Sequence, residues 1–383
     1  MPLFNVYPLY DVTPVKAKGV YVYDENDTEY LDLYGGHAVI SIGHAHPKYI
    51  EAITNQVNNL GFYSNAIQNP LQVKLADKIE ELSGCKDYEL FLCNSGAEAN
   101  ENALKLASFQ TNKSRVISFK NGFHGRTSAA VAATDNATII APINAQQKVT
   151  ILDLNDIESA KIEIEKGDVC AVIVEFIQGV GGLDEATANF FEQVDILCKT
   201  NNTLFIADEV QSGYGRSGKF FAFQHYEVTP DIISIAKGMG NGFPIGGILI
   251  HPNIEAKFGM LGTTFGGNHL ACAAGLSVLN VIEDEELIDN VNTISKHFVK
   301  IAKTIPQIKN IKGRGLMLGL EFDFEVSDLR KKLIYDYHVF TGGAKNKYVL
   351  RILPPLNVKK EHINLFFEAL VNALEELIKI QKR

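Results

Sequence analysis

The chain has 383 residues and carries 36 basic and 45 acidic side chains, which gives a formal net charge of −9. A net acidic chain without a block of basic residues is a poor candidate for binding the phosphate backbone of a nucleic acid, and no apolar run approaches the roughly 18 residues of a membrane-spanning helix. The five cysteines are widely spaced, lie in apolar segments and form no Cys-x-x-Cys pair. The N-terminus also lacks the basic and apolar blocks of a signal peptide, so we expect a cytoplasmic protein with reduced thiols.

The predicted elements begin with a hairpin over residues 19–33, where alternating apolar residues flank a polar turn. The middle of the chain then repeats one theme, a short apolar run followed by a polar or glycine-rich turn. The runs cover residues 88–93, 115–119, 169–176, 204–207 and 232–236. Because these runs are apolar on both faces and alternate with helical stretches, they predict a mostly parallel sheet with helices on both sides.

Helical periodicity returns from about residue 270. Two strands are predicted within residues 315–325 and 348–356, and they precede an amphipathic helix over residues 360–380. The last third of the chain therefore mixes helices and strands in a pattern that differs from the middle.

These elements indicate an α/β fold with a large domain over residues 46–271. A smaller α+β domain is expected to combine residues 1–45 with residues 272–383. About half of the 31 glycines lie between Gly179 and Gly275, in a stretch that is not low in complexity. A flexible linker therefore does not explain the glycines.

The residues that follow the apolar runs are candidates for a binding site. In an open parallel sheet, ligands bind beyond the carboxyl ends of the strands. The residues expected at those ends are Ser95, Gly96, Ala97, Phe123, His124, Gly125, Arg126, Glu175, Asp208, Gln211 and Lys237. This set defines the site that the sequence predicts.

Three of these positions have both a functional and a structural interpretation. The segment NSGAEAN, residues 94–100, either offers free N–H groups at a helix start to a phosphate or is an ordinary helix cap formed by Asn94 or Ser95. Asp208 is either the partner of a protonated heterocyclic nitrogen or a structural acid. Lys237 is either a buried amine with a lowered pKa, and so a nucleophile, or a lysine that extends from a strand end to solvent.

Two further patterns resemble ligand motifs. Residues 213–218, GYGRSG, fit the dinucleotide fingerprint G-x-G-x-x-G, but five residues separate them from the preceding apolar run and no clear helix follows. His44 and His46 lie two residues apart without an obvious third metal ligand. We therefore predict neither a nucleotide site nor a metal site here, and expect a turn with hydrogen-bonded histidines.

Together these residues resemble the class III pyridoxal-phosphate aminotransferases of fold type I, particularly their acetylornithine and ornithine branch. The matching segments run in family order from about residue 19 to the C-terminus, so the resemblance covers nearly the whole chain. They are NSGAEANENALKLA, FHGRT, ADEVQSGYGRSGKFFAF, PDIISIAKGMGNGFPIGG, TTFGGNHLACAAGLSVL, KGRGLMLGLEF and VLRILPPLNV. The resemblance implies a large domain with a mostly parallel sheet and a smaller α+β domain.

The resemblance implies a role for each cofactor-binding residue. Lys237 would be the catalytic residue, because it would form the Schiff base with the aldehyde of pyridoxal phosphate and then shuttle a proton. Asp208 would keep the pyridinium nitrogen protonated, so that the ring accepts electrons. Phe123 would stack on the ring and Gln211 would hydrogen-bond its 3-oxygen. The phosphate would be held by Ser95, Gly96 and Ala97.

The resemblance also implies partners and substrates. Thr264 would reach the cofactor phosphate of a partner subunit, so two active sites would be shared in an obligate homodimer. Arg126 would bind a substrate carboxylate, and Arg351 the α-carboxylate of glutamate or 2-oxoglutarate, since a guanidinium bonds a carboxylate at two points. We therefore expect a ping-pong aminotransferase that moves the δ-amino group of N-acetylornithine, or N-succinylornithine, to 2-oxoglutarate in arginine biosynthesis.

One segment departs from the family pattern. Ornithine-type members usually carry EPIQGE, whose last glutamate pairs with the substrate-binding arginine while the ω-amino substrate is bound. This chain has Phe176 in place of the proline and Val180 in place of that glutamate. Either another acid neutralises Arg351, or the acyl group of the substrate reaches it, as a succinyl group with its own carboxylate could.

Other interpretations share these motifs. A different ω-aminotransferase would act on ornithine or 4-aminobutyrate. An isomerase of glutamate semialdehyde is disfavoured, because Arg126 and Arg351 provide for two carboxylate-bearing substrates. A non-catalytic relative that binds pyridoxal phosphate for a regulatory or scaffold role is disfavoured by the intact Lys237, Asp208 and Gln211.

Overall fold

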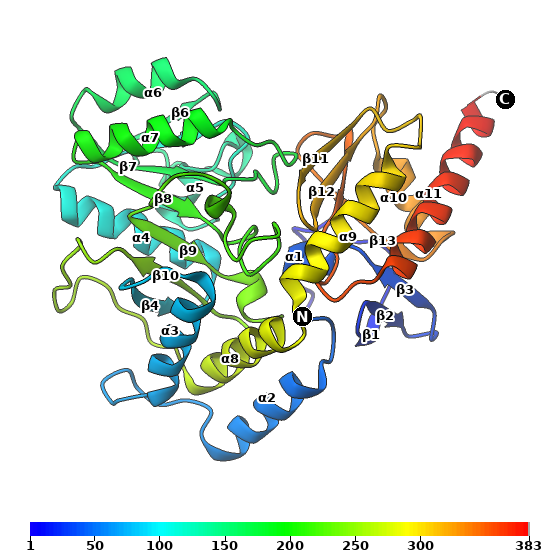
Figure 1. Ribbon diagram of the computed structural model, residues 1–383, viewed down its shortest axis with the longest axis horizontal. Helices are drawn as coiled ribbons and strands as arrows, with labels where there is room; N and C mark the ends of the chain where they lie inside the picture. The colour runs from blue at the N-terminus through cyan, green and yellow to red at the C-terminus, as the bar shows by residue number, and fades with distance from the viewer. Residues whose placement is uncertain (382–383) are drawn as a thin grey trace.

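A seven-stranded sheet forms the core of the larger of two lobes in the computed structural model, which describes residues 1–381 (Figure 1). Its strands are β4 (Glu89–Cys93), β5 (Arg115–Phe119), β6 (Val149–Leu152), β7 (Val169–Val174), β8 (Leu204–Asp208), β9 (Ile232–Ile235) and β10 (Gly246–Ile250). They lie in the order β4-β10-β9-β8-β7-β5-β6. All neighbours run parallel except β10, which is antiparallel to both β4 and β9. The mostly parallel sheet predicted from the apolar runs is confirmed.

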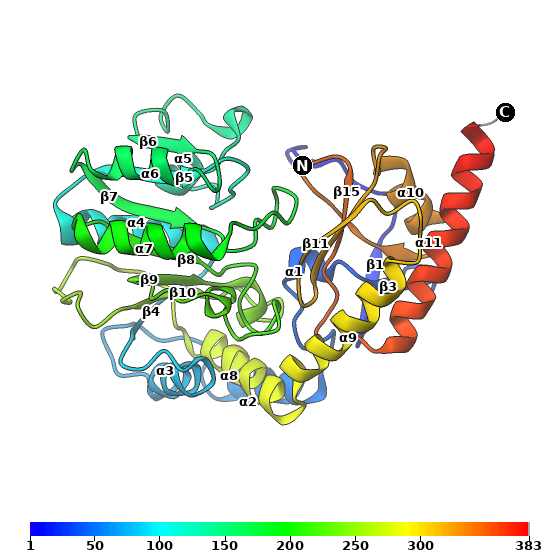
Figure 2. The ribbon, with the colours of Figure 1, turned by 45° about the horizontal axis from the view of Figure 1, so that its top comes forward.

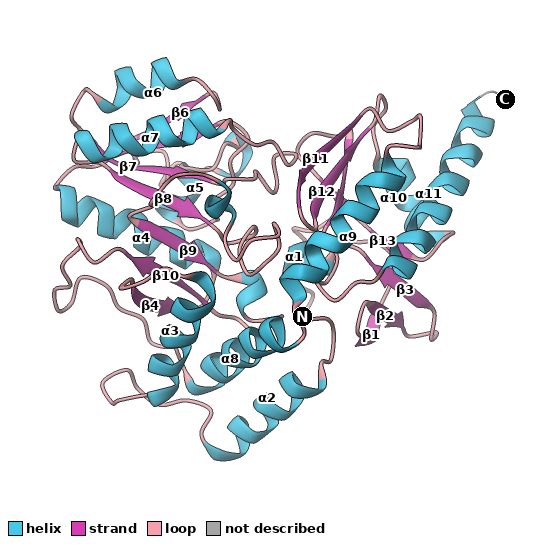
Figure 3. Ribbon diagram, viewed as in Figure 1, coloured by secondary structure: helices cyan, strands magenta, loops and turns pink. Residues whose placement is uncertain are grey.

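Helices lie on both faces of this sheet (Figure 3). They are α3 (Pro70–Ser83), α4 (Gly96–Thr111), α5 (Ser128–Ala132), α6 (Ile157–Ile164), α7 (Ala188–Thr200) and α8 (His269–Asp284), while α2 (Pro47–Asn59) packs on α8. In β8, Leu204 and Ile206 belong to the buried cluster that contains α4, whereas Phe205 and Ala207 belong to the cluster that contains α7. Since alternate residues of a strand face opposite sides, burial on both faces explains why Leu204–Ala207 is apolar at each position.

The smaller lobe contains two four-stranded sheets. The first has the order β1 (Pro14–Lys18), β2 (Tyr21–Asp24), β3 (Glu29–Asp32) and β13 (Val339–Phe340). The second has the order β11 (Asn310–Arg314), β12 (Met317–Glu321), β15 (Val349–Ile352) and β14 (Gly342–Gly343). Its helices are α1 (Gly35–Ala38), α9 (Leu287–Ala302), α10 (Ser327–Tyr335) and α11 (Lys360–Gln381).

We keep the division into residues 46–271 and residues 1–45 with 272–383 as a proposal. Its support is the parallel pairing of β3 with β13, which joins the N-terminal arm to the C-terminal third. The boundary after residue 271 falls in the first turn of α8, whose later turns pack on α2 and α3 before α9 crosses to the smaller lobe (Figure 2).

Most predicted elements have their counterparts. The hairpin is β2 and β3, the two late strands are β12 and β15, and the last helix is α11. Two strands of the large sheet were not predicted, β6 and β10. The start of β10 resembles a turn because it has two glycines, yet a Cβ on Gly247 would lie 2.7 Å from the Phe91 carbonyl oxygen of the paired strand. Glycine is there for close packing in a sheet.

The glycine-rich segment 213–218, which fits the dinucleotide fingerprint, has a structural role. Residues 213–218 form turns with no α-helix after them, and only a short 3-10 segment (Ala222–His225) follows. Arg216 in this segment is buried and donates to the carbonyl oxygens of Leu316, Pro354 and Ile40, so it ties the two lobes together.

The histidine pair is hydrogen-bonded as predicted. His44 Nε2 lies 2.8 Å from Asp32 Oδ2, and His46 Nε2 lies 2.8 Å from Glu285 Oε1. Within residues 1–381, no group of three His, Cys, Asp or Glu side chains is arranged to hold a metal ion.

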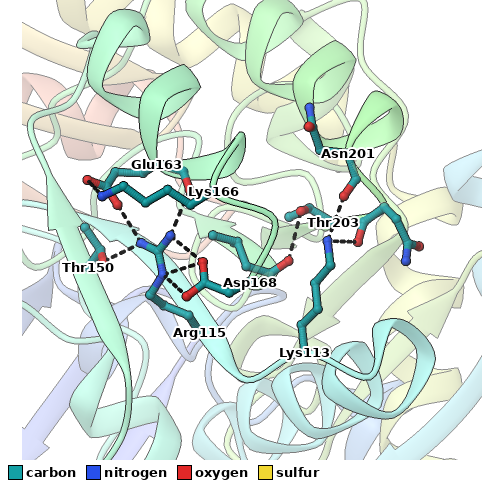
Figure 4. Close-up of polar contacts among 10 residues, drawn as sticks. Lys113, Arg115, Thr150, Glu163, Lys166, Asp168, Asn201 and Thr203 are labelled. Atoms are coloured by element: carbon teal, nitrogen blue, oxygen red, sulfur yellow. Dashed lines mark hydrogen bonds and ion pairs between the residues drawn. The ribbon is translucent and has the colours of Figure 1, made fainter.

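The amino ends of the strands are fastened by paired charges (Figure 4). Arg115, at the start of β5, places Nη2 2.6 Å from Asp168 Oδ1 and Nη1 2.7 Å from Glu163 Oε2, and Nη1 also donates to Thr150 Oγ1 at 2.9 Å. Lys113 donates nearby to the carbonyl oxygens of Asn201 and Asn202. The charges of Arg115 and Lys113 therefore both have partners within the described residues.

All five cysteines are buried and none is in a disulfide. Of the helices in the part of the chain that the structure describes, none is both long and apolar enough to cross a bilayer.

Candidate active site

A cavity of about 340 Å³ opens at the carboxyl ends of the central strands. Its lining includes ten of the eleven residues predicted from the strand ends, namely Ser95, Gly96, Ala97, Phe123, His124, Gly125, Arg126, Asp208, Gln211 and Lys237. Glu175 lies outside the lining. The rule that ligands bind beyond the carboxyl ends of parallel strands therefore located this cavity.

The N-terminus of α4 faces the cavity with two free donors. Ser95 caps the helix, because its Oγ accepts from the Glu98 N–H at 3.2 Å. Neither the Gly96 nor the Ala97 N–H donates a hydrogen bond to another group within residues 1–381. A Cβ on Gly96 would lie 2.5 Å from Val210 Cγ1, so only glycine fits there. The two interpretations of this segment thus hold together: it is a capped helix that leaves N–H groups for an anion.

Asp208 is a buried carboxylate with three donors. Its Oδ2 accepts from Asn100 Nδ2 and from His124 Nδ1, both at 2.7 Å, and its Oδ1 accepts from the Val210 N–H at 3.1 Å. Burial opposes a charge on His124, but the hydrogen bond and the charge of Asp208 outweigh burial and raise the pKa of His124. These three donors hold the Asp208 carboxyl group in a fixed position at the cavity.

Lys237 follows β9 and borders the cavity with no hydrogen bond from Nζ to any group of residues 1–381. Its φ is +46°, a left-handed conformation that a side chain with a Cβ rarely adopts and that clusters at functional sites. Desolvation lowers the pKa of Lys237, although Asp208 and Glu175 act in the opposite direction. The amine is therefore easier to deprotonate than an ordinary lysine.

Glu175 supports the site from behind the cavity wall. Its Oε1 accepts from the Phe123 N–H and its Oε2 from the Gly179 N–H, each at 2.9 Å. Burial and the charge of Asp208 raise the pKa of Glu175. Glu175 thus fixes the backbone on which Phe123 sits.

Gln211 carries an unsatisfied amide oxygen. Its Nε2 donates to the His37 carbonyl oxygen at 3.2 Å, while its buried Oε1 has no hydrogen-bond partner. The Gln211 amide also occupies the space that a Cβ on Gly179 would need. The side chain is therefore held at the cavity with one polar atom left for a ligand.

The two predicted substrate arginines differ in exposure. Arg126 is exposed at the cavity mouth. Arg351 is 3% exposed on β15, outside the cavity lining, and donates to the carbonyl oxygens of Gly343 at 2.5 Å and Gly179 at 2.8 Å. In the described part of the chain, no carboxylate lies within salt-bridge distance of Arg351. The positive charge of Arg351 is thus contacted by backbone carbonyl oxygens, where the family pattern would place a glutamate at position 180.

Thr264 lies outside this cavity, on an exposed segment that precedes α8. The structure of one chain does not bring it to the other predicted residues. Its role at a partner's cofactor stays a prediction.

Three contributors were not assigned roles from the sequence. Asn100 lies one turn after Ala97 on α4, and a buried asparagine on an otherwise apolar helix face was the signal that could have identified it. His37 lies in α1 of the smaller lobe and Tyr34 directly precedes that helix, and their contacts with Gln211 and Arg351 join residues far apart in the chain.

The arrangement suits a flat, phosphorylated heterocycle. Free N–H groups at α4 suit a phosphate, and the Asp208 carboxylate suits a protonated ring nitrogen. The unpaired Gln211 Oε1 leaves an amide group for a ring substituent, and Lys237 supplies an amine. These are the requirements of pyridoxal phosphate, so the residues present fit that cofactor.

Comparison with known proteins gives the same answer. Residues 5–374 match the aminotransferase class-III family. An acetylornithine aminotransferase from Aquifex aeolicus is 41% identical over 372 residues, which cover 94% of this chain and 96% of the relative. One from Bacillus subtilis is 40% identical over 368 residues, 94% of each chain. A crystal structure of the Toxoplasma gondii ornithine aminotransferase, with pyridoxal phosphate at partial occupancy in its active site, is similar with a TM-score of 0.90 at 29% identity, over 98% of this chain and 93% of that one.

Proposed function

The chain belongs to the aminotransferase class-III family and is a pyridoxal-phosphate-dependent transaminase, and on this premise we propose that it moves the δ-amino group of an N-acylornithine to 2-oxoglutarate. The products would be N-acylglutamate 5-semialdehyde and glutamate, a step of arginine biosynthesis. The relatives from Bacillus subtilis and Aquifex aeolicus that are named acetylornithine aminotransferase share 40% and 41% of their residues with the chain over nearly its whole length. This similarity favours an acylated substrate over free ornithine.

The observation that carries the proposal is that Lys237, Asp208 and Arg126 border one cavity. When bound, pyridoxal phosphate supplies an aldehyde that takes up the amino group and a ring that accepts electrons from the substrate carbon. We propose that Gly96 and Ala97 hold its phosphate with the Ser95 turn, that Phe123 covers the ring, and that Gln211 binds the 3-oxygen.

The acid–base work falls to Lys237. Desolvation lowers the pKa of Lys237, so its amine loses a proton more easily than an ordinary lysine, and a neutral Nζ can accept a proton from the substrate carbon that bears the amino group. Asp208 holds a proton on the ring nitrogen, and Asn100 and His124 keep its carboxylate in place. Removing either donor would leave Asp208 less well oriented.

The two arginines would sort the two substrates. Arg126, exposed at the mouth, would take the carboxylate of the acylornithine or the side-chain carboxylate of glutamate. Arg351, which already lacks an acidic partner, would take the α-carboxylate of glutamate or 2-oxoglutarate. Binding the two substrates in turn at the same cofactor corresponds to ping-pong kinetics.

A panel of amino donors with 2-oxoglutarate tests the proposal. We expect kcat/KM to be highest for an N-acylornithine and at least about ten-fold lower for ornithine and 4-aminobutyrate. A higher kcat/KM for either free amine would reassign the substrate. A visible absorbance band that no amino donor shifts would instead indicate a non-catalytic binding protein.

The acyl group is tested in the same panel. If a succinyl carboxylate reaches Arg351, kcat/KM for N-succinylornithine should exceed that for N-acetylornithine. A strong preference for the acetyl compound would contradict that hypothesis and leave N-acetylornithine as the substrate.

We further propose a cytoplasmic homodimer in which Thr264 completes the partner's phosphate site. Support comes from the exposed segment before α8, where Phe258 is fully exposed and Phe265 is 60% exposed. A mainly apolar groove of about 620 Å³ lies beside them, at the sheet-edge strand β4. Exposed apolar patches of this kind mark protein interfaces. Light scattering is expected to give twice the chain mass, and a fully active monomer would contradict the shared site.

A further inference from the structure

The guanidinium of Arg351 has only neutral partners. Two of its nitrogens donate to the Gly179 and Gly343 carbonyl oxygens, and the remaining one, Nη2, lies 3.5 Å from the Tyr34 hydroxyl. Tyr34 therefore provides the single side-chain oxygen next to Arg351 among residues 1–381. Desolvation lowers the pKa of this arginine, in keeping with a buried cation that no carboxylate compensates.

The ring of Tyr34 is fixed against Arg351. Arg351 Cζ lies 5.8 Å from the ring centroid, within the range of a cation–π contact. On β14, which pairs with β15, a Cβ on Gly342 would clash with the edge of the Tyr34 ring. Arg351 pairs directly with Gly342 in that register, so the glycine makes the space that lets Tyr34 reach the arginine.

His37 fixes the hydroxyl of Tyr34. The two side chains belong to one turn, and His37 Nδ1 lies 2.5 Å from Tyr34 Oη. Partial burial and the charges of Arg351, Lys237 and Arg330 lower the pKa of His37 to about 4. The imidazole is therefore neutral near pH 7, and a neutral ring nitrogen can accept the hydroxyl proton.

The turn that carries both side chains is strained and joined to the cofactor site. Gly35, Gly36, His37 and Ala38 have φ values of +54°, +54°, +68° and +62°, and two of these residues have a Cβ. The carbonyl oxygen of His37 accepts from Gln211 Nε2 at 3.2 Å. Such strain persists where neighbouring contacts fix the backbone, and it is common at ligand sites. In both views α1 lies on the side of the smaller lobe that faces the central sheet (Figures 1 and 2).

A second arginine makes this corner more positive. Arg330 donates to the Thr341 carbonyl oxygen at 3.2 Å and has a buried Nε without a partner. In the described residues no carboxylate forms a salt bridge with Arg330. Its guanidinium lies against Gly343, and the carbonyl oxygen of Gly343 accepts a hydrogen bond from Arg351. Two uncompensated guanidinium groups attract an anionic group.

We propose that Tyr34, oriented by His37, is the neutral partner of Arg351 and a specificity-determining residue for the dicarboxylate substrates. An arriving carboxylate bonds Nη2 of Arg351 and accepts the hydroxyl proton of Tyr34, which then leaves its hydrogen bond with His37. A neutral hydrogen bond breaks in this step, and no ion pair has to break. When an acylornithine presents its uncharged methylene chain, the hydroxyl stays between the guanidinium and the substrate. This inference rests on the proposed function, in which Arg351 receives glutamate and 2-oxoglutarate.

The test is the binding of glutarate, an unreactive dicarboxylate, to the holoenzyme by titration calorimetry. Tyr34→Phe removes the hydroxyl and keeps the ring. We expect its Kd for glutarate to rise about ten-fold, the size of a hydrogen bond to a charged acceptor. Tyr10→Phe is the matched control, because its ring lies over Arg330 and its hydroxyl forms no hydrogen bond within residues 1–381. It should bind glutarate like the wild type.

Single-turnover kinetics separate specificity from a general defect. In Tyr34→Phe, the half-reaction with N-acetylornithine should keep its kcat/KM within about two-fold, whereas the half-reaction with glutamate should lose about ten-fold. Equal losses in both half-reactions, or unchanged glutarate binding, would overturn the inference. A wild-type holoenzyme that fails to bind glutarate would overturn the role of Arg351 in the proposed function as well.

Discussion

The two ends of the central sheet treat charge in opposite ways. At the amino ends, Arg115 is bonded to Asp168 and Glu163, and Lys113 to two carbonyl oxygens (Figure 4). At the carboxyl ends, Lys237 has no hydrogen-bond partner within the described residues, and the Gly96 and Ala97 N–H groups are free. Paired charges at one end hold the strands together, while unpaired groups at the other end are available to a ligand.

The difference between the two ends shows where buried unpaired groups lower the stability of the folded chain. A buried group without a partner destabilises the folded chain unless a ligand completes it. The Lys237 amine and the Gln211 Oε1 are such groups at the carboxyl end of the sheet, and Arg351 on β15 is a buried cation that only neutral groups contact. Substitutions at that end should therefore change turnover, and substitutions at the opposite end should change stability.

The largest effect is expected at Lys237. Lys237→Ala removes the amine, so turnover should fall by at least about 1000-fold, because no other amine borders the cavity. Stopped-flow absorbance with N-acetylornithine measures the loss. Lys113→Ala, at the opposite end of the sheet, is the control and should keep full activity. Full activity in Lys237→Ala would overturn the assignment of the site.

The next largest effect is expected at Asp208. Asp208→Asn keeps the shape of the side chain but removes the charge opposite the ring nitrogen, so kcat should fall about 100-fold or more. His124→Asn removes one donor to that carboxylate, and a loss of about ten-fold is expected. Steady-state kinetics at saturating cofactor provide the comparison, and an equal loss in both variants would contradict the order of the roles.

The paired end should respond through stability. Arg115→Met deletes the charge but keeps much of the apolar stem, and leaves Asp168 and Glu163 without their partner. The free energy of unfolding should fall by about 1–2 kcal/mol, since these carboxylates remain partly solvated. Thermal unfolding measures this loss, while kcat/KM should stay at the wild-type value. A large loss of activity would show that the two ends are not independent.

An acidic side chain near Arg351 should pair with this arginine, as Asp168 and Glu163 pair with Arg115 at the amino ends of the strands. Val180 follows Gly179, whose carbonyl oxygen accepts from Arg351. A carboxylate in Val180→Glu would compete with the substrate for the guanidinium, so the KM for glutamate should rise about five-fold. Val180→Gln is the uncharged control. An unchanged KM for glutamate in Val180→Glu would mean that a side chain at position 180 does not reach Arg351.

The smallest effect is expected from the titration of His37. Its folded-state pKa of about 4 lies below the ordinary value of 6.5, so the unfolded chain binds more protons between these values. The free energy of unfolding should therefore fall as the pH drops through that window. Because the side chain remains exposed in part, the change should stay below about 1 kcal/mol.

His37→Asn removes this titration while keeping a residue that tolerates a positive φ. The Tm difference between about pH 7.5 and about pH 5 should therefore be smaller in the variant than in the wild type. An equal difference would show that another group titrates in this range.

The sequence by itself determined the large sheet and the cofactor end of the site. The runs before Asp208 and Lys237 are almost entirely apolar because both faces of each strand are buried, and the carboxyl ends of these parallel strands bring the residues that follow to one edge of the sheet. β10 was not predicted, because its two glycines resemble a turn in the sequence. They are needed for close packing against the neighbouring strand, which the sequence of β10 alone does not show.

Only the tertiary structure decided the partners of these residues. Asn100 and His124 meet Asp208 from different elements, and Tyr34 meets Arg351 across 317 positions of sequence. Such contacts depend on how α1, α4 and β15 pack against each other, and local sequence patterns do not determine the angles at which these elements pack. The sequence located the missing glutamate at Val180, but only the folded chain revealed that carbonyl oxygens and a tyrosine surround Arg351 in its place.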